Sequence, residues 1–157
     1  MCNIWTSRSF WSFIAALFIV AFGLNWVWEM IQMRAYVEMA EHSWRETAFR
    51  CAEATLGDVA LTFSICGVGA LAAGQLQWPM KDTWNVYGTA ALLGGILGAA
   101  IEWRALAIGR WSYNDQMPVV PLLRVGLWPL LQLGLLVPTA FWIAVRFTVN
   151  RKQNKAS

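Results

Sequence analysis

Charged residues are scarce in this sequence, and the places where they are missing indicate the fold. Asp, Glu, Lys and Arg together make up 13% of the 157 residues, whereas a soluble domain carries roughly 25%. Four runs contain none of them: residues 9–28, 59–80, 83–101 and 125–145. A helix needs about 20 apolar residues to cross the hydrocarbon core of a bilayer. The composition therefore argues against a soluble domain and for four membrane-spanning helices.

Cysteine and histidine are too few and too scattered for the common metal and redox motifs. The three cysteines show no CxxC spacing, and His42 is the only histidine. His42 is a candidate proton shuttle or metal ligand, but near a helix break a solvated interfacial role fits it better. The Glu-x-x-His pairs of metal-binding carboxylate bundles do not occur, and neither do G-x-S-x-G or H-E-x-x-H. We expect no metal site, and the cofactor, if any, stays unknown.

The uncharged runs predict an all-α fold, a four-helix transmembrane bundle that forms a single domain over residues 1–157. Backbone groups in lipid must be hydrogen-bonded internally, and a helix does this within one segment. We place the spans at about 10–32, 52–75, 85–106 and 124–147.

The first two predicted helices are expected to extend beyond the bilayer. Apolar residues recur three and four apart through residues 33–44, with charged residues between them, which is typical of an amphipathic interfacial helix. Ser43 and Glu46 fit a capping box that would begin the second helix. On the third helix, Gly94, Gly95 and Gly98, with Ala91 and Glu102 on or near the same face, predict a face that lets another backbone approach closely. We expect that face to pack against the small residues of the second helix.

The charges divide unevenly between the two predicted faces. Four spans place both termini on one side, and six of the 12 basic residues fall on each side. The compact basic tail at residues 151–155 favours cytoplasmic termini, in a bacterial inner membrane. Eight of the nine acidic residues lie on the opposite face, where every basic residue is Arg. Because Arg pairs well with carboxylates, this face is expected to form a folded layer of ion pairs.

Polar residues recur on the predicted spans in the half of the bilayer away from the termini. Ionisable groups within spans mark functional sites, because exposing them to lipid is costly. The predicted catalytic residues are Glu29, Asp58 and Glu102. The predicted substrate-binding residues are Asn25, Trp26, Trp103, Arg104, Trp111, Tyr113, Asp115 and Gln132.

A structural interpretation of these residues stays open beside the functional one. Glu29, Asp58 and Glu102 each lie at the end of an uncharged run, so they would mark the water boundary, with nearby tryptophans as an aromatic belt. The depth of Asn25 and Gln132 argues against this, since both lie a turn or more inside any span that begins at a tryptophan. The polar, aromatic segment 109–118 is then a lid over a pocket or a structural clasp.

Two short segments resemble known families. Residues 25–29, Asn-Trp-Val-Trp-Glu, resemble the Asn-x-x-Trp-Glu segment of membrane-bound terpene cyclases. Glu102, followed by Gly-Arg-Trp-Ser-Tyr at 109–113 and by Pro118, is similar to the Glu…Gly…Tyr…Pro pattern of membrane carotenoid hydratases and lycopene cyclase domains. Both groups of relatives are longer and have more spans. The resemblance implies acid-initiated chemistry on a polyprenyl chain, with Glu29 matching the cyclase carboxylate and Glu102 the hydratase one.

Two functions remain open. The first is a membrane enzyme acting on an isoprenoid-type lipid, with Glu29 or Glu102 as general acid and Asp58 as its counterpart. A carboxylic acid kept protonated in a low-dielectric site can donate a proton, and aromatic faces stabilise a developing carbocation. The second is a non-catalytic small transporter, or a subunit that binds a pigment, a partner membrane subunit, or a hydrophobic or anionic small molecule. Both functions involve membrane lipid, and no long basic run indicates nucleic-acid binding.

Overall fold

Four long helices dominate the fold. The computed structural model describes residues 7–39, 42–81 and 83–153. The helices are α1 (Ser7–Gln32), α2 (Trp44–Ala72), α3 (Trp84–Ala107) and α4 (Leu127–Gln153). The shorter elements are the 3-10 turns η1 (Met33–Ala35), η2 (Val37–Met39) and η3 (Trp78–Lys81), and a hairpin of β1 (Val119–Val120) and β2 (Val125–Gly126). The predicted all-α fold is confirmed, and the small hairpin between α3 and α4 is an addition to it.

Each long helix, α1 together with η1, provides a segment that is long and apolar enough to cross a membrane. These segments are Ser9–Ala35, Trp44–Ala72, Trp84–Ala107 and Leu127–Val149. They agree in number and order with the predicted spans. Large apolar side chains also point outward from the helices, among them Ile19, Ile31 and Leu71. Such an apolar surface is compatible with an integral membrane protein, because lipid would cover it.

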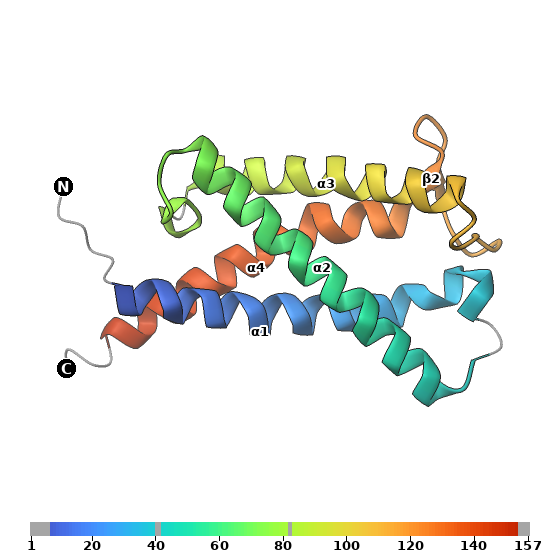
Figure 1. Ribbon diagram of the computed structural model, residues 1–157, viewed down its shortest axis with the longest axis horizontal. Coiled ribbons are helices and arrows are strands. Elements are labelled where there is room, and N and C mark those ends of the chain that lie inside the picture. Colours follow the sequence, from blue (N-terminus) through green and yellow to red (C-terminus); the bar gives the residue numbers. More distant parts are fainter. Residues whose placement is uncertain (1–6, 40–41, 82, 154–157) are drawn as a thin grey trace.

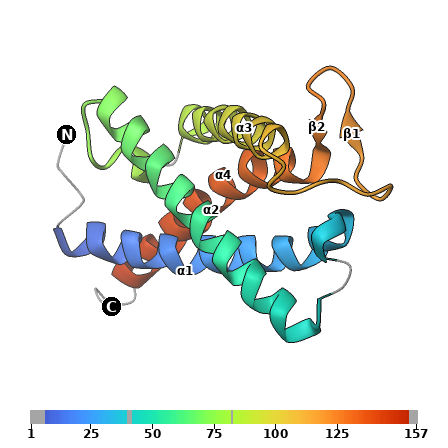
Figure 2. The same ribbon diagram turned by 45° about the vertical axis from the view of Figure 1, so that its right-hand side comes forward.

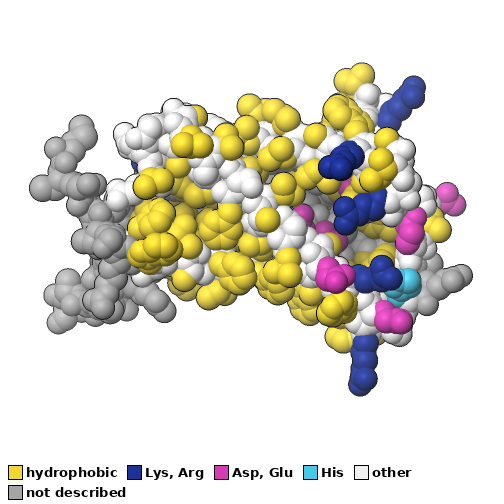
Figure 3. All heavy atoms as spheres, in the orientation of Figure 1, with side chains coloured by type: hydrophobic (Ala, Val, Ile, Leu, Met, Phe, Trp, Pro, Cys, Tyr) yellow, Lys and Arg dark blue, Asp and Glu magenta, His cyan; other side chains and the backbone are white. Residues whose placement is uncertain are grey.

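The helices are arranged around α4. This helix packs along both α1 and α3, while α2 packs across α1 (Figure 1). In Figures 1 and 2, α2 lies near α3 only at the end of the bundle that holds the termini, and the two helices diverge towards the other end. The apolar core, which includes Phe13, Leu17, Val137 and Phe141, occupies the half of the bundle nearest the termini. The charged side chains gather in the other half (Figure 3).

The glycine face of α3 packs against α4, so the prediction that it packs against α2 is wrong. A Cβ atom on Gly94 would overlap the backbone of Leu133, and one on Gly98 would lie 3.4 Å from the carbonyl oxygen of Pro129. On α2, Gly69 leaves room for the ring of Trp78 in η3 instead. Small residues indicate that two segments approach closely, but their pattern does not identify the partner.

The predicted helical extension of α1 is also wrong. The helix ends at Gln32, and two 3-10 turns flank Tyr36, whose backbone is extended and forms an isolated bridge with Tyr113. The backbone N–H of Asn114 donates to the carbonyl of Ala35 at 3.1 Å. Long-range backbone hydrogen bonds therefore replace the helical ones, which the local amphipathic pattern cannot reveal. Residues 40 and 41 of that stretch, and the basic tail from residue 154, lie outside the described residues.

The start of α2 follows the prediction. Ser43 precedes the helix, and its hydroxyl accepts a hydrogen bond from the backbone N–H of Glu46. In return, the backbone N–H of Ser43 donates to the Glu46 carboxylate at 2.9 Å. This capping box satisfies two of the backbone donors that a helix start leaves without partners. It sets where α2 begins, and hence which of its residues face α1.

Candidate functional site

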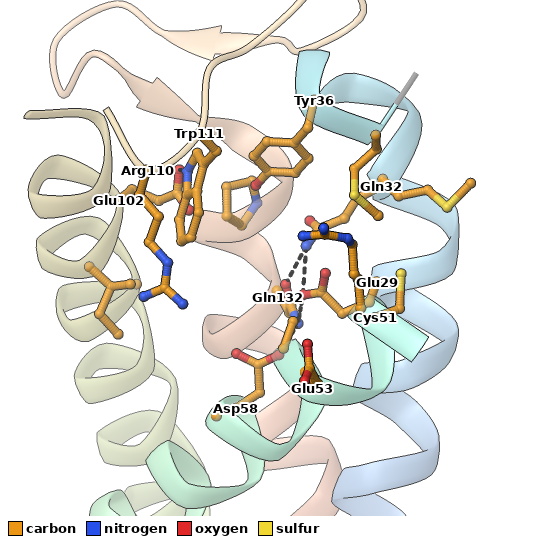
Figure 4. Close-up of a pocket in the computed structure, with 18 of the residues that line it drawn as sticks. Glu29, Gln32, Tyr36, Cys51, Glu53, Asp58, Glu102, Arg110, Trp111 and Gln132 are labelled. Atoms are coloured by element: carbon orange, nitrogen blue, oxygen red, sulfur yellow. Dashed lines mark hydrogen bonds between the residues drawn. The ribbon is translucent and has the colours of Figure 1, made fainter. Parts of the chain in front are cut away.

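A cavity of about 440 Å³ lies in the charged half of the bundle. All four long helices contribute to its wall, together with the η turns after α1 and the loop after α3. The three predicted catalytic residues, Glu29 of α1, Asp58 of α2 and Glu102 of α3, all line it. Figure 4 shows Glu29 and Glu102 on different sides of this space, with Gln132 of α4 between α1 and α2. Helices far apart in the sequence thus bring the three carboxyl groups to one cavity.

Gln132 connects the carboxyl groups of α1 and α2. Its Nε2 donates to Glu29 Oε1 at 2.9 Å and to Asp58 Oδ2 at 2.8 Å. The same nitrogen lies 3.1 Å from Oδ1 of Asn25. Both amide residues are buried, with Gln132 only 3% exposed. Because an amide nitrogen carries two hydrogens, three acceptors compete here for two donors.

Trp28 and Gln32 determine which way the Gln132 amide faces. The indole Nε1 of Trp28, which can only donate, bonds to Gln32 Oε1 at 3.0 Å. The Nε2 of Gln32 must then point the other way, and it donates to Gln132 Oε1 at 2.8 Å and to Glu29 Oε1 at 2.9 Å. Each bond orients the next. The chain of hydrogen bonds therefore runs in one direction, from the indole of Trp28 to the carboxyl groups of Glu29 and Asp58.

Glu102 is held by residues of the loop that follows α3. It is 4% exposed, and its Oε2 accepts from the hydroxyl of Tyr113 and from Nε1 of Trp111, the latter at 3.3 Å. The backbone N–H of Gly126, in β2, donates to the Tyr113 oxygen at 2.9 Å. Burial, and then the bond to Glu102, raise the pKa of Tyr113, so its phenol stays a hydrogen-bond donor. A Cβ atom at Gly126 would crowd the side chain of Met117 first and then the ring of Tyr113.

Tyr36 completes the aromatic wall on the α1 side. Its ring lies edge-on to Trp111 with centroids 6.1 Å apart, and its centroid is 5.7 Å from that of Tyr113. Burial and the nearby Glu102 raise the pKa of Tyr36, which keeps this phenol neutral as well. The segment 109–118 thus closes one side of the cavity and also holds Glu102. The sequence left open whether this segment is a lid or a structural clasp, and its contacts fit both descriptions.

Six of the eight predicted substrate-binding residues do not line the cavity, and two of these, Asn25 and Tyr113, contact it through hydrogen bonds with Gln132 and Glu102. The other four lie farther out. Trp103 is half-exposed, and its indole donates to a backbone carbonyl in the hairpin turn. The indole of Trp26 reaches a backbone carbonyl of α2. Arg104 and Asp115 are exposed and do not line the cavity. On a helix each residue turns by about 100°, so Trp103 and Arg104, the two residues after an inward Glu102, can face outward.

Most of the residues that line the cavity were not among the predicted site residues, and Gln32, Tyr36 and Arg50 are instructive examples. Gln32 shares the helical spacing of Asn25 and Glu29, and this signal was sufficient to include it. The position of Tyr36 depends on the extended backbone after α1, which no periodicity indicates. Arg50 was assigned to a layer of ion pairs and not to the cavity.

Several acidic groups on this face accept hydrogen bonds from neutral donors, namely Glu29, Glu38, Asp58 and Glu102. The layer of ion pairs expected from the sequence stays a prediction. The Glu38 carboxylate accepts from the hydroxyl of Ser112 at 2.8 Å. Although slight burial opposes the effect, hydrogen bonds from its own backbone and from Ser112 lower the pKa of Glu38. The guanidinium of Arg110 lies over the ring of Trp111, 5.3 Å from its centroid. Within residues 7–39, 42–81 and 83–153, no cluster of three His, Cys, Asp or Glu residues is placed to hold a metal ion.

Comparisons of this chain with protein-family models, with curated proteins and with solved structures found no match. The functional argument therefore depends on the cavity itself. Its features are three carboxyl groups, an oriented chain of amides, and aromatic rings on the wall. These groups can donate, accept and relay protons, and they can stabilise positive charge.

Proposed function

We propose that this chain is an integral membrane enzyme that carries out acid–base chemistry on an isoprenoid-type lipid. The observation that supports this most is the convergence of Glu29, Asp58 and Glu102, from three helices, on one cavity. A partly apolar cavity with a few convergent polar groups is the usual form of a small-molecule site. Ionisable side chains within membrane-spanning segments are energetically costly, so their presence there usually marks a functional site.

In this proposal the acid is the Glu29–Asp58 pair. Both carboxyl groups accept from one nitrogen of Gln132, and that nitrogen has more acceptors than hydrogens. A proton held between Glu29 and Asp58 supplies the missing donor and relieves the repulsion between two close carboxylates. That proton is transferred to an alkene carbon of the substrate: a C–H bond forms from the π electrons, and a carbocation remains.

Glu102 is the base. It accepts a proton from a water molecule that adds to the cation, which gives an alcohol, or from a carbon next to the cation, which gives a new alkene. In both cases one proton enters the substrate and one leaves, so the enzyme returns to its starting state after a proton passes back to Glu29 and Asp58. Tyr113 and Trp111 hold the Glu102 carboxylate in position through their hydrogen bonds.

The aromatic wall suits a cationic intermediate. The electron-rich faces of tyrosine and tryptophan attract positive charge, by about 0.5–2 kcal/mol each depending on solvation. Tyr36 and Trp111 line the cavity. The termini are placed in the cytoplasm of a bacterium in this proposal, on the basis of the basic tail, which puts the cavity in the opposite half of the inner membrane.

Isosteric substitution of the carboxyl groups tests the proposal. Cells with and without the gene are compared for their isoprenoid lipids, and any substrate found is given to the purified protein in lipid nanodiscs. Glu29→Gln, Asp58→Asn and Glu102→Gln should each lower turnover by about 10²–10⁴-fold, the usual contribution of a general acid or base. Asp115→Asn, an exposed acid outside the cavity, is the matched control. Identical lipid profiles with and without the gene would refute the proposal.

A non-catalytic transporter or ligand-binding subunit is the second candidate, since the same cavity and carboxyl groups would bind a ligand in exchange for protons. The packing of the other half of the bundle favours the enzyme. Phe13, Leu17 and Phe141 are fully buried there, and a transport path would have to pass through them. Uptake into proteoliposomes that depends on pH and on Asp58 would reverse this preference.

A further inference from the structure

The cavity has small and apolar lining residues on the side between α2 and α3. Gly57 and Leu61 of α2 and Gly98 and Ile101 of α3 line this side. The two helices lie close only near the termini and diverge beside the cavity (Figure 1). Figure 3 shows the surface hollowed between them, with acidic side chains visible inside. Charged side chains surround this hollow in Figure 3. The cavity therefore opens between two segments, Trp44–Ala72 and Trp84–Ala107, that are long and apolar enough to cross a membrane.

Gly57 leaves this opening wide. A Cβ atom added to it would meet no other atom within 4 Å, and the residue is exposed. A chain of methylene or isoprene units fits beside such a backbone, since nothing in the protein fills that space. The polar groups lie deeper, with Asp58 next to Gly57 in the sequence and Glu29 and Gln132 joined to it by hydrogen bonds.

The charges around the cavity restrict the polar end of the occupant. The lining contains five carboxyl groups but only two guanidinium groups: Glu29, Glu38, Glu53, Asp58 and Glu102 against Arg50 and Arg110. An anionic head group, such as a phosphate, would meet net repulsion there. An uncharged or cationic end would not, because it adds no negative charge to a partly desolvated site.

We propose that the cavity takes a long-chain amphiphile directly from the membrane, through the opening between α2 and α3. The uncharged or cationic end of the amphiphile lies at Glu29 and Asp58, and its apolar chain leaves past Gly57 and Ile101. This inference rests on the proposed function for the identity of the cavity as a substrate site, and it adds the route and the class of substrate. A water-soluble substrate would instead reach the carboxyl groups from the polar end of the bundle.

Photo-crosslinking in nanodiscs tests the route without requiring turnover. The probe is a long-chain isoprenoid alcohol with a photoreactive diazirine in its chain, and labelled peptides are identified by mass spectrometry. Labels are expected on the cavity-facing segments of α2 and α3. Gly57→Leu fills the opening and should reduce this labelling by about tenfold or more, equivalent to at least 1.4 kcal/mol.

Gly67→Leu is the matched control, since it is also an exposed glycine of α2 with nothing within 4 Å of an added Cβ, but it does not line the cavity. Equal labelling of wild type and Gly57→Leu would overturn the proposed route. Probes of the same chain length that end in a phosphate or a trimethylammonium group test the class. The ammonium probe should compete at least about tenfold better than the phosphate probe, and the reverse order would overturn the assignment.

The two proposals fail in different ways. If Gly57-dependent labelling is found but Glu29→Gln and Glu102→Gln leave the lipids of the cell unchanged, the route stands and the enzyme proposal fails. If those carboxyl variants abolish turnover while Gly57→Leu leaves both labelling and turnover intact, the enzyme stands and the route fails.

Discussion

The two halves of the bundle are formed by the same four helices but differ in packing and polarity. On α1, Phe13, Leu17, Asn25 and Glu29 follow one another at spacings of four or eight. They form a stripe that winds slowly around the helix, because four residues exceed one turn of about 3.6 residues, and it passes from the packed core to the polar cavity. On α4, Phe141 belongs to the core and Gln132 to the cavity. The half near the termini is close-packed, and the other half is open and held by hydrogen bonds. In the function proposed above, one half provides stability while the other provides the chemistry.

Removing a large side chain from the packed half should have the largest effect on stability. Phe141 is fully buried and lies edge-on to Trp78, with ring centroids 6.0 Å apart. Phe141→Ala should cost about 3–5 kcal/mol, because a cavity is left among side chains that cannot collapse into it. Thermal unfolding in detergent measures the loss, with the exposed Phe147→Ala as control. A similar small effect of both changes would contradict the division into two halves.

The contact between α3 and α4 should be the next most sensitive. Gly94→Ala places a methyl group against the backbone of Leu133 and should destabilise the protein by about 1–3 kcal/mol, as overpacking usually does. Gly95→Ala is a matched control one residue away, since its Cβ would meet nothing within 4 Å. Both variants are compared by thermal unfolding in the same detergent. If Gly95→Ala were the more harmful change, α3 would present a different face to α4.

The hydrogen-bonded half should respond to the loss of one amide. Gln132→Leu removes a donor from Glu29 and Asp58 and an acceptor from Gln32, which should cost about 1–3 kcal/mol of stability. Turnover should fall by more than the stability loss explains, because the carboxyl pair is no longer oriented. Thr139→Val is the control on α4, since that hydroxyl is exposed and bonds only to its own helix. Normal turnover in Gln132→Leu would show that the proposed function does not depend on the amide network.

The smallest effect concerns alkaline pH. The pKa values of Tyr36 and Tyr113 are raised above the ordinary value of 10.0, so the folded state keeps protons that the unfolded state loses. Their contribution to stability is complete below pH 10 and is lost as pH rises above it. Unfolding temperatures in detergent should therefore fall above pH 10, and Tyr113→Phe should flatten this dependence while costing about 0.5–1.5 kcal/mol at neutral pH. If the unfolding temperature of Tyr113→Phe fell with pH as steeply as that of the wild type, the Tyr113 hydroxyl would not be a group with a raised pKa.

Much of the fold could be predicted from the sequence, because its signals are local. Runs of about 20 uncharged residues indicate spans whatever their neighbours are, and Ser43 with Glu46 marks the start of α2. The structure also brings Glu29, Asp58, Glu102 and Gln132 to one cavity.

The errors concern the surroundings of these residues. Trp103 and Arg104 were grouped with Glu102 because they are adjacent in the sequence, whereas neighbours on a helix face different directions. Tyr36 was overlooked because its extended backbone pairs with Tyr113, 77 positions later in the chain.

The sequence by itself determined the number of helices, their order and the positions of the ionisable groups along them, since these depend on where charges stand along the chain. Only the tertiary structure decided which helices meet. It pairs the glycines of α3 with α4, lets α2 diverge from α3, and folds Tyr113 back onto Glu102. The physical reason is that close packing and long-range hydrogen bonds depend on the complementarity of two surfaces. Each surface is visible in the sequence, but the match between them is not.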